Sequence, residues 1–372
     1  MIQTGKIKTY PFWGEPAILF PVIILAGLGI IMVHSASASI SVTEHGSALY
    51  YVKKQFIFCA MGLVIMFVAS LIPYKMLNHL AYFILFSAFL FLLAVQVPGL
   101  GIKAGGAYRW LNVAGFTFQP SEFAKLALII FLAYSLSKKQ EMISNFLVGF
   151  LPHVFILGLL AVLILIQPDL GTVVIMGAIS WIMMFVAGVR IIHLLSPAPL
   201  LVPFIYFLVY KVEYRMARIF AYRNPWDDPL NTGYQITHSL KAFGSGGLFG
   251  KGMGMGMQKL HYLPEPHTDF ILSIIGEELG LVGVLGILTL YTIVIIKGIG
   301  IAREADTLFG TFLATGITSS LALQVTINTG VTMGLLPTKG LTLPFLSYGG
   351  TSLIMNMAGM GILMSIAASK TK

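Results

Sequence analysis

The sequence has very little charge. Only 10% of its 372 residues are Asp, Glu, Lys or Arg, whereas soluble domains usually carry about 25%. A surface in contact with water cannot be built from so few charged side chains, so a water-soluble protein is excluded. Cysteine is nearly absent as well. The single residue, Cys59, excludes an intrachain disulfide and a cysteine-based metal or redox centre.

Hydrophobic residues make up 57% of the chain and form long runs. Several runs reach the roughly 20 residues that a helix needs to cross a bilayer. We therefore predict an all-α integral membrane protein with about ten transmembrane helices and one long loop outside the cytoplasm. The predicted spans lie near residues 16–36, 56–73, 77–97, 120–136, 146–166, 170–189, 191–210, 270–297, 307–335 and 348–368.

Basic residues indicate the orientation of these spans. An even number of spans puts both termini on one side of the membrane. If that side is the cytoplasm, each of its segments carries Lys or Arg, as the positive-inside rule expects. These residues are Lys6, Lys8, Lys75, Lys138, Lys139, Arg190, Lys297, Arg303, Lys370 and Lys372. The long segment 211–269 then lies outside. Because this scatter suits membrane topology, the net charge of +9 does not predict a nucleic-acid partner.

Two segments are expected to be irregular. Ser196-Pro197-Ala198-Pro199 interrupts the seventh span, and each proline removes a backbone donor, so that helix should be kinked or displaced. In the stretch 250–257, glycine alternates with other residues, which forbids a stable helix in water. We predict a mobile loop there.

Ionisable residues gather in the segments that are predicted to lie outside. Glu122 and Lys125 are three residues apart on the fourth span, so they can neutralise each other. They form either a structural ion pair or part of a functional interior, and both interpretations stay open. Asp169 precedes the sixth span and is interpreted as an N-cap.

The long outer segment has the densest polar cluster. Arg215 and Arg218, with apolar neighbours, predict a basic amphipathic helix on the membrane interface. Such a helix binds lipid headgroups or holds the phosphates of a lipid-linked substrate, and composition favours the headgroups. His261, Glu265 and His267 suggest a metal site, but their spacing matches no fixed ligand pattern.

Asp269 stands directly before the eighth span, with Glu277 and Glu278 further along it. Asp269 is either a helix cap or a functional carboxylate. A run of ionisable residues entering a membrane is costly unless it lines a cavity. The last outer turn, 336–352, contains paired prolines and glycines, which predicts a broken, re-entrant backbone against a polar cavity. Lys339 in this turn is a natural contact for an anion.

Several motifs together resemble the SEDS family of shape, elongation, division and sporulation proteins. They are His34-Ser35-Ala36-Ser37, Arg109-Trp110, Gln119-Pro120-Ser121-Glu122 with Lys125, Gln167-Pro168-Asp169-Leu170-Gly171-Thr172, Leu263-Pro264-Glu265 with His267-Thr268-Asp269-Phe270, and Leu343-Pro344-Phe345-Leu346-Ser347-Tyr348-Gly349-Gly350. The resemblance runs from the first span to the last. The segments 224–229, 233–235 and 336–342 look more like the division branch than the elongation branch, and sporulation members are close to the division branch.

This resemblance implies a peptidoglycan glycosyltransferase that polymerises lipid II onto a growing glycan strand and releases undecaprenyl pyrophosphate. It implies that residues 1–372 form one membrane domain, with the long outer loop 211–269 inside it. The family's catalytic aspartate maps to Asp269. The positions that match the family's central cavity or substrate site are Arg109, Glu122, Lys125, Arg215, Arg218, Lys339 and Ser347. His261 departs from the family pattern, since some relatives carry an acid there.

Transfer of a sugar from a lipid pyrophosphate requires a base and positive charge. An ionised carboxylate can accept the proton of the attacking sugar hydroxyl, and positive charge must stabilise the leaving pyrophosphate. Arg215, Arg218, Lys125 and Lys339 or a divalent cation, Mg²⁺ or Mn²⁺, can supply that charge. No other cofactor is expected. The resemblance also implies a bacterial inner-membrane location, a class B penicillin-binding protein as crosslinking partner, and contacts with other division proteins.

Two other functions compete with this one. A flippase of lipid-linked precursors would also have broken helices and charges inside the membrane. However, the charges of this chain cluster on one face, and no paired inverted halves are visible. A non-catalytic scaffold would need Asp269 only as a helix cap.

Overall fold

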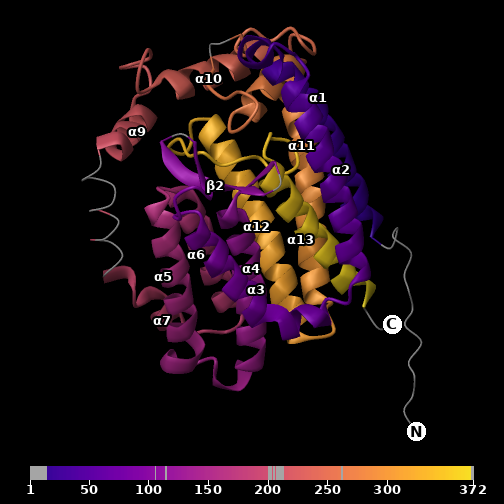
Figure 1. The fold of residues 1–372 in the computed structure, drawn as a ribbon, viewed down its shortest axis with the longest axis vertical. Helices are drawn as coiled ribbons and strands as arrows, with labels where there is room; N and C mark the ends of the chain where they lie inside the picture. The colour runs from indigo at the N-terminus through magenta and orange to yellow at the C-terminus, as the bar shows by residue number, and fades with distance from the viewer. Residues whose placement is uncertain are drawn as a thin grey trace.

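The computed structural model describes residues 15–104, 106–113, 115–199, 203, 206, 213–260 and 263–369. Within these ranges the protein is a bundle of long helices with a small sheet (Figure 1). The helices are α1 (Pro16–His45), α2 (Tyr50–Leu71), α3 (Lys75–Ala94), α4 (Pro120–Lys138), η2 (Gln140–Met142), η3 (Phe146–Phe150), α5 (Leu151–Ile166), α6 (Leu170–Val186), α7 (Ile191–Leu195), α9 (Glu213–Arg223), α10 (Tyr234–Gly246), α11 (Ile271–Arg303), α12 (Leu308–Thr332) and α13 (Gly350–Ala368).

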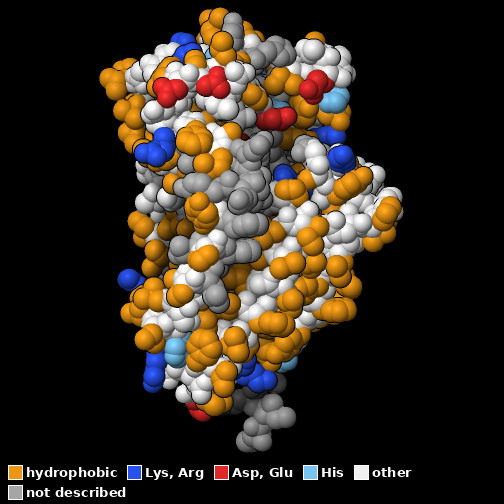
Figure 2. Space-filling model, turned by 90° about the vertical axis from the view of Figure 1, so that its left-hand side faces the viewer, with side chains coloured by type: hydrophobic (Ala, Val, Ile, Leu, Met, Phe, Trp, Pro, Cys, Tyr) orange, Lys and Arg blue, Asp and Glu red, His pale blue; other side chains and the backbone are white. Residues whose placement is uncertain are grey.

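The prediction of a helical membrane protein is confirmed. Among the described residues, eight helices are long and apolar enough to cross a membrane, and the shorter α6 is apolar as well. α7 ends at Leu195, directly before the predicted interruption. From residue 200 on, the seventh predicted span lies outside the described residues, apart from residues 203 and 206. On the face drawn in Figure 2, charged side chains gather toward the two ends, and hydrophobic side chains cover most of the surface between them. This distribution is typical of a protein surrounded by lipid.

Hydrophobic runs alone missed two features. α1 continues through a polar stretch to His45 and ends only at Gly46, whose positive φ of 68° stops the helix. The segment before α4, which was expected to be a loop, forms an antiparallel sheet in the order β1-β2-β3. Its strands are β1 (Gly101–Ala104), β2 (Ala107–Val113) and β3 (Phe116–Phe118).

The arrangement of the helices decides which polar residues face the interior. α4, α12 and α13 are buried along most of their length, whereas α2 and α3 expose most of theirs. α12 packs against α4 and α11, and α13 packs against α2 (Figure 1). Polar side chains on α4, α12 and α13 are therefore held inside the protein, where they need partners or a cavity.

The stretch 250–257 is not a mobile loop, so that prediction is wrong. Together with the next two residues it forms the glycine loop (residues 250–259), which lies on α11 where this helix breaks at Gly280. Gly280 has a φ of 67°, which few residues other than glycine adopt. A Cβ there would also collide with the backbone of Leu248 and Gly250. The glycines here permit close backbone contact.

Candidate functional site

Asp269 lies at the start of α11. The helix begins at Ile271, and its N-cap residue is Phe270, which makes no side-chain cap bond. Asp269 therefore stands one residue before the N-cap position.

The backbone around Asp269 is held by distant parts of the chain. Three consecutive carbonyl oxygens, those of His267, Thr268 and Asp269, each accept one hydrogen bond. The donors are Tyr348 N at 2.8 Å, Ser347 Oγ at 2.6 Å and Asn328 Nδ2 at 2.9 Å. These donors come from α12 and from the segment between α12 and α13, which we call the lysine loop (residues 333–349). The segment that carries Asp269 is thus fixed against the lysine loop.

Gly340, the neighbour of Lys339 in sequence, lies close to Asp269. A Cβ built on Gly340 would lie 3.2 Å from Asp269 Oδ2, so the lysine loop touches the carboxylate. Burial lowers the pKa of Lys339 below its ordinary value, and the negative charge of Asp169 opposes that shift. Asp169 itself accepts a hydrogen bond from Thr172 N at 3.0 Å as the N-cap of α6, which confirms its predicted role.

Arg109 ties the sheet to the same region. Its Nε donates to Gln167 O at 2.8 Å, and its Nη2 donates to Pro168 O at 3.0 Å. The turn between α5 and α6 also contacts the lysine loop, since a Cβ on Gly171 would lie 3.3 Å from the side chain of Leu341. The sheet, the turn between α5 and α6 and the lysine loop therefore lie together in one region.

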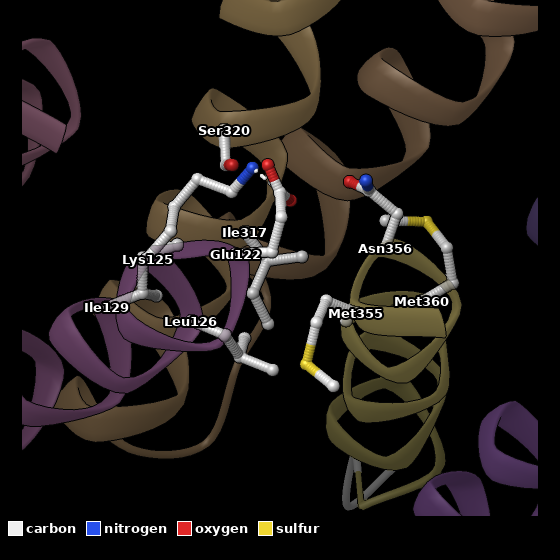
Figure 3. A pocket seen from close by; sticks show the side chains of 10 residues that line it. Glu122, Lys125, Leu126, Ile129, Ile317, Ser320, Met355, Asn356 and Met360 are labelled. Atoms are coloured by element: carbon white, nitrogen blue, oxygen red, sulfur yellow. Dashed lines mark hydrogen bonds and ion pairs between the residues drawn. The ribbon is translucent and has the colours of Figure 1, made fainter. Parts of the chain in front are cut away.

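Glu122 and Lys125 form the predicted ion pair, with 2.8 Å between Lys125 Nζ and Glu122 Oε2. Both side chains are at most 10% exposed. They line a small cavity between α4, α12 and α13. Figure 3 shows the pair reaching from α4 toward Ser320 of α12, with Asn356 of α13 on the opposite side. A buried pair beside a cavity with both polar and apolar lining residues is compatible with both interpretations that the sequence left open.

Ser347 is buried in the lysine loop, and its hydroxyl bonds within the protein. It donates to Thr268 O and accepts from Leu343 N at 2.8 Å. The loop turns at Phe345, whose φ of 67° is rare for an aromatic residue. The hydroxyl of Tyr291 on α11 donates to Pro344 O beside this turn. The predicted broken backbone is present, and it is anchored on several sides.

Two further predictions concern the long outer segment. Arg215 and Arg218 lie on α9, so the predicted helix exists, but their side chains lie outside what the structure describes. Figure 1 places α9 at the edge of the molecule. His261 also lies outside the described residues.

His267 adjoins Asp269 in the sequence and is 3% exposed. Burial lowers its pKa to about 4, so the imidazole is neutral at neutral pH. Its Nε2 lies 3.7 Å from Glu265 Oε2, and its ring packs beside Tyr51 and Tyr348. Among the described residues, no group of three or more His, Cys, Asp or Glu side chains comes together as a metal site.

Glu277 and Glu278 are both fully buried, and the glycine loop holds them. Glu277 pairs with Lys251 at 2.9 Å and accepts the backbone N–H groups of Met257 and Gln258, each at 3.0 Å. Its side chain therefore has one ionic and two backbone partners, which compensates for the cost of burying a carboxylate.

Glu278 pairs with Lys259 at 2.6 Å and accepts the N–H of Gly254 at 2.9 Å. Ser35 of α1 donates to the same carboxylate at 2.6 Å. The two carboxylates thus fasten the glycine loop and α1 to α11, instead of lining the cavity that the sequence analysis required.

No role was predicted from the sequence for three residues of this region, Asn328, Lys251 and Lys259. Asn328 is one of two buried amides in α12, with Gln324, and is 1% exposed. A polar residue inside a membrane span needs a partner. The position of Asn328 in the sequence could therefore have marked it as a candidate for a structural or functional role. Lys251 and Lys259 gave no signal, because lysines in a glycine-rich segment are usually solvated.

The fold and the site together define a multi-pass helical membrane protein in which an aspartate and a lysine loop meet among buried ion pairs. Residues 16–372 match the model of the FtsW, RodA and SpoVE family of cell cycle proteins. The chain belongs to this family, which confirms the family that was identified from the motifs.

Similar proteins are known from both sequence and structure. The chain is 47% identical to the probable peptidoglycan glycosyltransferase FtsW of Geobacter metallireducens, over 94% of this chain and 93% of that one. It is 42% identical to stage V sporulation protein E of Bacillus subtilis, over 95% and 97% of the two chains. The greater likeness to the division branch is thus confirmed.

Two solved structures have the same fold. One is a chain from a peptidoglycan synthase complex that coordinates polymerization and crosslinking, with a TM-score of 0.78, 28% identity, and 97% and 98% of the two chains covered. The other is the rod shape determining protein RodA of Thermus thermophilus, with a TM-score of 0.69, 27% identity, and 98% and 99% covered.

Proposed function

We propose that this protein is a peptidoglycan glycosyltransferase that polymerises lipid II during septal wall synthesis. The names of the similar proteins and the family membership of this chain support this activity. Within the molecule, one observation carries the proposal. The carboxylate of Asp269 lies close to Gly340, the neighbour of Lys339 in sequence, so a carboxylate and a half-buried lysine come from adjoining parts of one site.

Asp269 acts as the general base in this proposal. The acceptor's sugar hydroxyl loses its proton to the carboxylate while its oxygen bonds to the anomeric carbon of the donor. The bond between that carbon and the pyrophosphate oxygen breaks, and undecaprenyl pyrophosphate leaves with the electron pair.

Lys339 stabilises the leaving pyrophosphate. A half-buried cation is stronger toward an anion than a fully solvated one, because water screens it less. Arg109, Arg215, Arg218 and the buried Lys125 are proposed to contact other parts of the lipid-linked substrate. A divalent cation, Mg²⁺ or Mn²⁺, that arrives with the pyrophosphate would supply charge of the same kind.

We further propose that both termini are cytoplasmic and that the reacting end faces outside the bacterial inner membrane. Lys138 and Lys139 end α4, Arg190 precedes α7 and Arg303 ends α11. These are the segments in which the positive-inside rule expects basic residues on the cytoplasmic side. A class B penicillin-binding protein is the proposed partner. The likeness to a chain from a peptidoglycan synthase complex supports this partner.

The experiment replaces Asp269 with asparagine in the full chain with its partner. Asn has nearly the same shape, but its amide cannot accept the hydroxyl proton. We expect polymerisation of lipid II, scored as glycan chains on gels, to fall by roughly 100-fold or more. Expression and partner binding should stay near the parent level, because the backbone bonds of residues 267–269 do not use this side chain.

The same assay separates the alternatives. A flippase would move labelled lipid II across liposomes without making glycan chains. A scaffold would bind division proteins equally well with either residue. An Asp269→Asn variant that polymerises lipid II near the parent rate would show that Asp269 is not the base.

A further inference from the structure

Asn328 is the residue through which two parts of the site are joined. Its Nδ2 donates to Asp269 O at 2.9 Å and to Leu341 O at 2.6 Å. Both partners are carbonyl oxygens, which can only accept hydrogen bonds. The amino group of the Asn328 side chain, and not its amide oxygen, must therefore face them. One buried side chain thus connects the Asp269 segment with the lysine loop, two residues from Lys339.

The two partners would lose more than a bond if Asn328 were absent. Asn328 is 1% exposed and Leu341 is 7% exposed, so water does not readily replace the amide. A buried carbonyl that is left without a donor destabilises the fold locally. The Asp269 segment and the lysine loop would then relax independently of each other.

Gly340 completes this contact from the other side. Asp269 Oδ2, at 3.2 Å, is the only heavy atom within 4 Å of a Cβ built on Gly340, among the described residues and apart from its chain neighbours. The position does not require a positive φ, so an alanine would fit the backbone. Its methyl group would press on the carboxylate of Asp269 alone.

We propose that Asn328 is a positioning residue for polymerisation, which holds Asp269 and the lysine loop in one fixed relation, and that Gly340 supplies the gap that the carboxylate occupies. This inference rests on the proposed role of Asp269 as the base. A displacement of about 1 Å at a reacting group can cost roughly 100-fold in rate. The position of the carboxylate therefore affects kcat more than the affinity for lipid II.

The test measures kcat and KM for lipid II in the full chain with its partner. Gly340→Ala should lower kcat by about 10-fold or more and change KM by less than about 3-fold. Gly349→Ala is the matched control in the same loop. Its Cβ would lie 3.2 Å from Thr342 Cγ2 instead of a carboxylate, so kcat should stay near the parent value.

Asn328→Leu removes both donors at similar side-chain volume and should also lower kcat. Because this variant changes a buried position, its thermal unfolding and partner binding are measured in parallel. Gly340→Ala does not depend on that control, since it adds one methyl group in a loop. If Gly340→Ala and Asn328→Leu both retain the parent kcat, the positioning role is overturned.

A double variant distinguishes this inference from the proposed base. In an Asp269→Asn background there is no base to misplace, so adding Gly340→Ala should change the residual rate little. Fully additive losses would show that Gly340 acts through something other than Asp269 and would overturn the inference. High activity of Asp269→Asn alone would instead overturn the proposed base.

Discussion

Replacing Lys259 with methionine should release the glycine loop from α11. Lys259 Nζ lies 2.6 Å from Glu278 Oε1, and the two side chains are 9% and 0% exposed. Methionine keeps most of the aliphatic stem but removes the charge. The carboxylate would retain Ser35 and the Gly254 N–H, but it would lose its cation in a site that water does not reach.

The expected cost follows from this burial. Removing one partner of a buried ion pair typically costs about 3–5 kcal/mol, because the other charge stays buried. Lys251 offers a matched comparison, since its pair with Glu277 has a similar distance of 2.9 Å but its side chain is 35% exposed. Solvent screens that pair more, so Lys251→Met should cost about 1 kcal/mol or less.

Hydrogen exchange measures the difference locally. The N–H groups of Gly254, Met257 and Gln258 bond to the two carboxylates, so their exchange reports opening of the glycine loop. Lys259→Met should speed this exchange by about 100-fold or more, and Lys251→Met by less than about 10-fold. Adding Glu278→Gln to Lys259→Met should restore much of the protection, since no charge is then left unpaired. Equal effects of the two lysine variants would refute the reasoning from burial.

Three other outcomes follow from the site and the topology. Lys339→Ala should lower both kcat and kcat/KM for lipid II, because the cation stabilises the charge that develops on the leaving pyrophosphate in our proposal; an unchanged kcat would contradict that role. The folded pKa of His267, about 4 against an ordinary 6.5, predicts that stability falls as the pH drops from about 6.5 to 4, where the unfolded chain takes up the proton first. His267→Gln should remove up to about 3 kcal/mol of that dependence in thermal unfolding, and an unchanged pH dependence would exclude it. In a Cys59→Ala background, Asn231→Cys should react with an impermeant maleimide in intact cells, whereas Glu141→Cys should react only after permeabilisation; the reverse pattern would invert the topology.

Hydrophobic runs predicted the helices well. A span in lipid must form its own backbone hydrogen bonds and is therefore helical, so the length of the apolar run indicates the length of the helix. Pairs close in sequence were also predictable. The Glu122–Lys125 ion pair follows from helical spacing, and the Asp169 cap from its place before α6. For these features the interaction is local, so a short stretch of sequence contains both partners.

The features that local sequence could not predict depend on distant partners. Glycine spacing in residues 250–257 suggested mobility, but the loop is fixed by Glu277 and Glu278, about 20 residues further on in the chain. Asn328 donates to a carbonyl 59 positions away. The sheet beside α4 was missed because its short strands do not show clear alternation. Which carboxylate meets which loop is decided by packing, and packing is not visible in a single sequence.

The three carbonyl contacts of residues 267–269 also set an order of events during synthesis. Ser347 lies 79 positions after the Thr268 carbonyl that it binds, and Tyr348, the last of the three donors, follows it. A ribosome has therefore long finished Asp269 before all three donors exist. Until α12 and the lysine loop have entered the membrane, the aspartate is present but not held in place. An incomplete chain is therefore expected to be inert, which spares the cell a half-made enzyme acting on its wall precursor.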